Sequence, residues 1–75
     1  MREKLLMVFK ETFPEADFDL KDFESLTINS FEEWDSMGNL NLLMNVESEF
    51  NIRLTSEQLS EIKSINEILD ILKQR

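Results

Sequence analysis

The sequence predicts a small all-α domain with three longer helices, one short helix and a long connection after the first helix. A single glycine and a single proline leave few turn residues for a multistranded sheet. Apolar residues instead recur at intervals of three and four, which places them on one face of a helix. The 75 residues are enough for one domain, expected over 1–75. Three apolar faces on so short a chain must pack together as a bundle.

The first helix is expected from Arg2 to about Phe13. Its apolar residues have the spacing of one helical face: Leu5, Leu6, Val8, Phe9 and Phe13. Pro14 disfavours helical backbone at the residue before it, so the helix should end there. Residues 15–33 show no sustained period and are expected to form a long ordered loop, with a short helical turn near residues 20–25. Such loops are uncommon in small domains and are often functional.

A second helix is expected over Ser36–Phe50. Its apolar residues step along one side, with Leu42 and Leu43 broadening the stripe that should face the core. The stepping residues are Met37, Leu40, Met44, Val46 or Glu47, and Phe50.

Two capping-box patterns predict the remaining helices. Thr55-Ser56-Glu57-Gln58 opens a short helix that reaches about Ile62. Ser64-Ile65-Asn66-Glu67 opens a last helix, whose apolar face consists of Ile65, Ile68, Leu69 and Leu72.

The composition argues against several functions. Sixteen acidic and eight basic residues give a net charge of −8, which repels nucleic acid and anionic membranes and favours partners with basic patches. Histidine and cysteine are absent, so neither an imidazole base nor a thiolate metal site is available. No apolar run approaches the length of a membrane span, and Met1–Lys4 leads into an amphipathic stretch. We expect a soluble, cytoplasmic monomer.

Asp35 and Ser36 stand where the long loop meets the second helix. Asp and Ser are preferred helix N-caps, so the structural interpretation of this pair is a cap. The helix start also offers unpaired N–H groups and the positive end of the dipole, which favour an anion such as a phosphodiester on Ser36. Glu32, Glu33 and Asp35 oppose that anion. Position alone leaves both interpretations open.

Asp35-Ser36-Met37 at the head of this helix resembles the signature of the acyl carrier protein family, which is Asp-Ser-Leu at the start of a helix that ends in Glu-Phe. Further matching positions are Leu40, Leu42, Leu43, Met44, Val46, Glu47, Glu49, Phe50, Ile52, Leu54, Ile62 and Ile65. The lengths of the first helix, the long loop and the short third helix also agree. The resemblance covers essentially the whole chain and implies an acyl-carrier-protein-like bundle.

The resemblance implies that Ser36, flanked by Asp35 and Met37, bears a covalent 4′-phosphopantetheine arm. A phosphopantetheinyl transferase would attach the arm from coenzyme A with magnesium. An acyl- or aminoacyl-loading ligase or transferase would then form a thioester on the arm for downstream biosynthetic enzymes. The thioester keeps the carbonyl electrophilic, and the arm raises its effective concentration at successive sites. The chain would be a carrier and not an enzyme.

The second helix departs from fatty-acid carriers, whose exposed face is heavily acidic. Its polar positions here are Gly38, Asn39, Asn41, Asn45 and Ser48, with charge mainly at Glu47 and Glu49. Weaker electrostatic steering by this helix, and more polar contacts with partners, are therefore expected. The expected partner-binding residues are Trp34, Asn39, Asn41, Asn45 and Glu47. Trp-Asp-Ser resembles carriers of specialised pathways that make polyketides, nonribosomal peptides, cell walls or surface sugars, which indicates a dedicated carrier.

Alternatives remain for the chain and for individual residues. An unmodified helical adaptor would share the fold. A small serine hydrolase would need a histidine, and Trp34 stands where the nucleophile elbow has its first glycine. Trp34 is either a core anchor or a partner contact. Met37 and Met44, with Leu43, Val46 and Ile62, either line an adaptable pocket for an acyl chain or pack in the core.

Overall fold

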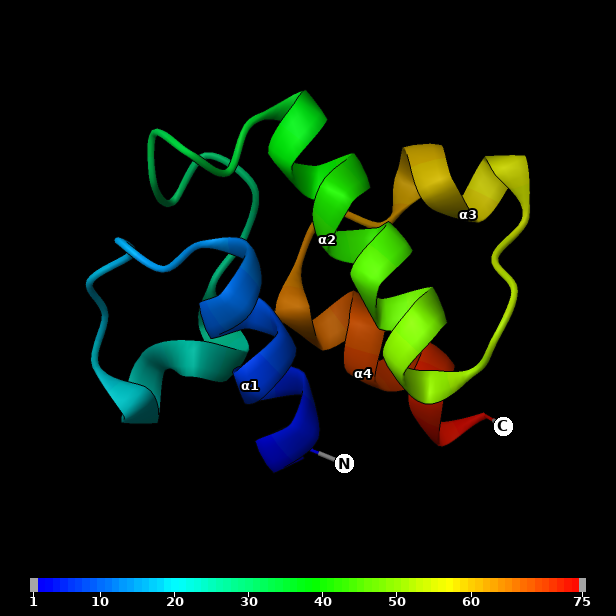
Figure 1. Cartoon of the computed structure of the whole chain (residues 1–75), viewed down its shortest axis with the longest axis horizontal. Coiled ribbons are helices and arrows are strands. Elements are labelled where there is room, and N and C mark those ends of the chain that lie inside the picture. Colours follow the sequence, from blue (N-terminus) through cyan, green and yellow to red (C-terminus); the bar gives the residue numbers. More distant parts are fainter. Residues whose placement is uncertain (1, 75) are drawn as a thin grey trace.

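The computed structural model describes residues 2–74. Within this part the chain forms four α-helices and one 3₁₀ helix (Figure 1): α1 (Arg2–Thr12), η1 (Leu20–Ser25), α2 (Ser36–Phe50), α3 (Ser56–Glu61) and α4 (Ile65–Lys73). About 64% of it is helical and it contains no strand, which confirms the all-α class. No helix of residues 2–74 combines the length and the apolar composition needed to cross a membrane.

The helix ends follow local signals in the sequence. Helix α1 ends one residue before Phe13, and α2 has the predicted bounds. Thr55 and Gln58 form the expected capping box at α3. At α4 the Ser64 side chain accepts from the Glu67 N–H, but the Glu67 carboxylate accepts from the N–H of Lys63, not from that of Ser64. The second capping box is therefore only partly as predicted.

The long connection after α1 is held by aromatic side chains. Phe9 of α1 lies at the centre of an aromatic cluster that consists of Phe9, Phe13, Phe18, Phe23, Phe31 and Trp34. The Phe9 ring centroid is 5.3 Å from that of Trp34 and 5.5 Å from that of Phe23, and both pairs meet edge to face. Such pairs add about 0.5–1.5 kcal/mol each beyond simple burial. The ring contacts explain how residues 13–35 are ordered with little regular structure.

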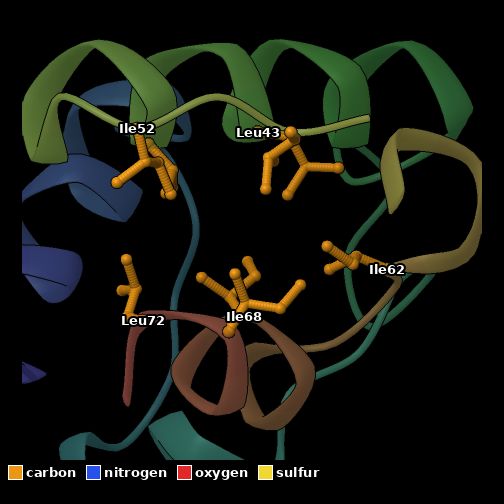
Figure 2. A pocket seen from close by; sticks show the side chains of 8 residues that line it. Leu43, Ile52, Ile62, Ile68 and Leu72 are labelled. Atoms are coloured by element: carbon orange, nitrogen blue, oxygen red, sulfur yellow. The ribbon is translucent and has the colours of Figure 1, made fainter. Parts of the chain in front are cut away.

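A second apolar region lies between α2 and the C-terminal part of the chain. This aliphatic cluster surrounds a small cavity and consists of Leu43, Val46, Ile52, Leu54, Ile62, Ile68, Ile71 and Leu72. Figure 2 shows Leu43 and Ile52 on one side of the cavity, opposite Ile68 and Leu72 of α4. The cavity measures about 10 Å³, close to the space that a single water needs.

A short backbone pairing joins the long connection to the segment before α4. Thr27 and Ser64 form an antiparallel bridge. The Ile28 N–H donates to the carbonyl of Lys63 at 2.7 Å, and the Ile65 N–H donates to the carbonyl of Leu26 at 3.1 Å. These bonds fix the start of α4 against residues 26–28.

The apolar stripe expected on α2 is buried in one part and exposed in another. Met37, Leu40 and Met44 are 77%, 44% and 54% exposed. Leu42, Leu43 and Val46 are buried as expected, and Asn39, which was not part of the stripe, is buried with them. Both sets have helical spacing, and the packing of α1 against α2 decides which of them is covered.

Candidate functional site

The junction between the long connection and α2 separates the roles of Asp35 and Ser36. Asp35 is the N-cap, and its Oδ1 accepts from the Gly38 N–H at 2.8 Å. Ser36 is the first residue of α2 and is exposed. Within residues 2–74 no hydrogen bond engages the Ser36 hydroxyl. Asp35 therefore supplies the cap, and the Ser36 hydroxyl is left available.

Gly38 allows the chain to enter α2 at this angle. A Cβ atom at Gly38 would clash with the carbonyl oxygen of Glu33 and would lie 3.0 Å from Cε1 of Phe13. The close approach of the residue 33 backbone thus requires glycine. Gly38 therefore helps to set the position of Ser36. The sequence had suggested instead that Gly38 belongs to an exposed polar face. The sequence held one signal for this role, which is that the single glycine of the chain stands in the first turn of the second helix.

Trp34 and Asn39 form a buried bridge, which corrects their expected role. Trp34 is 0% exposed and Asn39 is 5% exposed. The Trp34 Nε1–H donates to Asn39 Oδ1 at 2.9 Å, and Asn39 Nδ2 donates to the carbonyl of Ile62 at 2.8 Å. Burial contradicts the prediction that these two side chains are exposed for partner binding, and for Trp34 it supports the alternative of a core anchor. They join the long connection, α2 and the end of α3 beneath Ser36.

Two further residues expected to bind partners make contacts within the chain. Asn45 is exposed, but its Nδ2 donates to Oγ1 of Thr12 on α1 at 2.8 Å. Glu47 is half-buried, and its Oε2 accepts from the Leu54 N–H at 2.7 Å, which holds the connection to α3. Asn41 is exposed and makes no hydrogen bond through its side chain within residues 2–74. Of the expected set, Asn41 is the member whose side chain is both exposed and uncommitted.

The surface of α2 next to Ser36 is apolar, which the sequence interpretation missed. Met37, Leu40 and Met44, the exposed stripe, lie at i, i+3 and i+7 and follow directly from Ser36. Large exposed apolar groups gathered on one face mark interaction sites in monomeric proteins. The spacing was visible in the sequence, but it was interpreted as a core face.

A groove opens beside Ser36 between α2 and α3. It measures about 450 Å³, within the range of roughly 300–1,000 Å³ that ligand pockets occupy. Its lining residues are Ile28, Ser36, Asn39, Leu40, Ser56, Leu59, Ser60 and Lys63. Ser36 is thus one of the residues that border this groove. The residues present therefore fit a group that is covalently attached to Ser36 and extends from it.

The site does not provide the parts of a hydrolase or of a metal centre. The chain contains no histidine, and within residues 2–74 no side chain hydrogen-bonds to the Ser36 hydroxyl to act as its base. The same residues contain no group of three or more acidic side chains placed to hold a metal ion. What the geometry offers is an accessible serine hydroxyl.

Comparisons of the chain with protein-family models, with curated proteins and with solved structures return no match. The resemblance to acyl carrier proteins therefore rests on the residues of this chain.

Proposed function

We propose that the chain is a carrier protein that holds an acyl or aminoacyl group as a thioester on a 4′-phosphopantetheine arm attached to Ser36. The observation that carries the proposal is that Asp35 and Ser36 have different roles at the start of α2. Asp35 accepts the capping hydrogen bond, while Ser36 is exposed and borders a groove, and its hydroxyl makes no hydrogen bond within residues 2–74. The competing interpretation of Ser36 as a cap is thereby weakened. The resemblance of Asp35-Ser36-Met37 and the following helix to the family supplies the identity of the arm.

Attachment of the arm would be a phosphoryl transfer to Ser36 with coenzyme A as donor. Ser36 Oγ would form a bond to the phosphorus that bears the pantetheine, and the bond from this phosphorus to the bridging oxygen of the diphosphate would break. Adenosine 3′,5′-bisphosphate would leave, and the Ser36 hydroxyl proton would pass to a base of the transferase. The chain lacks a histidine for this step, so the base and the magnesium site belong to the transferase in this proposal.

The exposed stripe is the surface that we assign to partner enzymes. Met37, Leu40 and Met44 are apolar, and Asn41 adds an uncommitted amide beside them. Methionine side chains adapt to differently shaped surfaces, which suits a carrier that meets a transferase, a loading enzyme and later enzymes in turn. The net charge of −8 would add a general attraction to basic partners without fixing the geometry of contact.

The test is attachment of the arm, measured by intact mass. The purified protein is incubated with coenzyme A, magnesium and a broad-specificity phosphopantetheinyl transferase. The wild type should gain one phosphopantetheine group, and Ser36→Ala should gain none. Ser48→Ala is the matched control, since Ser48 is an exposed serine elsewhere on α2, and it should be modified like the wild type.

Two results would contradict the proposal. No gain of mass with several transferases would favour the unmodified adaptor, which would use the same exposed stripe. A gain that persists in Ser36→Ala would place the arm on another residue.

A further inference from the structure

The groove beside Ser36 is lined at a second point by Lys63. The Lys63 carbonyl accepts from the Ile28 N–H at 2.7 Å, and its own N–H donates to Oε1 of Glu67 at 3.1 Å. The backbone of Lys63 is thus fixed on both sides, while its side chain is exposed. Within residues 2–74 no ion pair engages the Lys63 ammonium. Oε1 of the nearby Glu67 carboxylate accepts from the Lys63 N–H and from the Ser64 hydroxyl, not from the Lys63 ammonium. Lys63 therefore offers an unpaired ammonium group on a side chain whose backbone is fixed.

The rest of the groove matches the chemistry of a pantetheine chain. Ile28, Leu40 and Leu59 provide apolar walls. The Ser60 hydroxyl donates to the carbonyl of Glu57 at 3.0 Å, so its oxygen can still accept a hydrogen bond. The Ser56 hydroxyl makes no hydrogen bond within residues 2–74 and can donate or accept. The groove thus combines a cation, an apolar wall and two hydroxyls.

A phosphopantetheine arm presents complementary groups. Its phosphodiester carries a negative charge, a branched dimethyl group follows, and two amides lie farther along. Because the arm would start at Ser36 in the groove wall, it can reach this surface without crossing the protein.

We propose that the resting arm folds back along the groove between α2 and α3, with its phosphodiester paired to Lys63 and its amides near Ser56 and Ser60. The inference rests on the proposed function, since it requires the arm on Ser36. An ion pair at an exposed lysine is weak, so partner enzymes can draw the arm out. Leu40 borders both surfaces, but Met37 and Met44 do not line the groove, so these two residues of the exposed stripe stay free for those enzymes.

The test compares the apo and holo forms by amide chemical shifts. Wild type, Lys63→Gln and Lys10→Gln are each prepared in both forms, and full attachment is verified by mass. In the wild type, attachment should shift amides of residues 56–63 as well as those next to Ser36. In Lys63→Gln the shifts at 56–63 should fall about two- to fivefold, the range expected for loss of an exposed ion pair. Added salt should reduce the same shifts in the wild type.

Lys10→Gln is the matched control, because it removes the same charge from an exposed position on α1 that does not line the groove. It should give wild-type shifts. Each variant is compared with its own apo spectrum, which also reports that the fold is retained. Shifts confined to the neighbours of Ser36, or unchanged in Lys63→Gln, would overturn the inference and leave the carrier function standing. Failure to attach the arm at all would overturn both.

Discussion

The aromatic and aliphatic clusters are built in different ways. In the aromatic cluster, rings from α1 and from the long connection meet at Phe9 in fixed edge-to-face geometries. In the aliphatic cluster, branched side chains of α2, α4 and the intervening segments surround a cavity of about 10 Å³ (Figure 2). Directional ring contacts order a segment that has little secondary structure, whereas the aliphatic side chains leave room between helices. We therefore expect the second region to adjust more easily than the first.

This difference bears on where an acyl group could lie if the chain is the carrier that we propose. Of the residues proposed for an acyl pocket, Leu43, Val46 and Ile62 do line the cavity. Met37 and Met44 do not, because both are exposed. A cavity with space for about one water cannot hold an acyl chain unless the surrounding helices move apart. The adjustable side of the core is where such movement would occur.

The largest effect is expected at the centre of the aromatic cluster. Phe9→Ala removes a ring that contacts Phe13, Phe18, Phe23 and Trp34 and should lower the free energy of unfolding by about 3–5 kcal/mol. Denaturant unfolding measures this loss. Phe50→Ala is the control, because Phe50 is only half-buried at the end of α2, and it should cost less. If Phe9→Ala lowered the free energy of unfolding by no more than Phe50→Ala does, the aromatic cluster would not be the main source of stability.

A smaller effect is expected where the two regions are joined. Asn39→Ala leaves the Trp34 Nε1–H and the Ile62 carbonyl without their partner, at about 1–3 kcal/mol for each unsatisfied group. We expect a loss of about 2–3 kcal/mol, because water entering the space left by Asn39 would offset part of it. Faster hydrogen exchange at the Trp34 indole should accompany the loss.

Asn41→Ala is the matched control for Asn39→Ala. Asn41 is exposed and makes no side-chain hydrogen bond within residues 2–74, so its effect should stay within about 0.5 kcal/mol. Similar unfolding free energies for the two variants would mean that the bridge does not couple the two regions.

Local signals explain what the sequence could predict. Helices begin and end at signals such as Pro14, the caps at Asp35 and Thr55, and the spacing of apolar residues. Each of these signals depends on only a few neighbouring residues. The bounds of α2 were therefore predictable, as was Ser36 at its start.

Contacts between distant segments explain what the sequence could not predict. The burial of Asn39 depends on the Ile62 carbonyl, and the inward role of Glu47 depends on the Leu54 N–H. Asparagine and glutamate are usually exposed, so composition alone placed both on the surface. The exposed stripe was misplaced for the same reason, because the packing of α1 and α4 against α2 decides which side of α2 is covered.

The smallest effect is expected in the aliphatic cluster. Ile68→Val removes one methyl group from the wall of the cavity and should lower the free energy of unfolding by about 0.5–1.5 kcal/mol. Side chains that already border empty space can shift to close part of the gap, which favours the lower end of that range. Met44→Leu is the control, because Met44 is exposed and leucine has a similar volume, and it should change the free energy of unfolding by less than about 0.5 kcal/mol. A loss for Ile68→Val that approaches the loss for Phe9→Ala would show that the aliphatic cluster is as rigidly packed as the aromatic one. The region could then not open for a cargo at low cost, and any acyl group on Ser36 would have to stay outside the core.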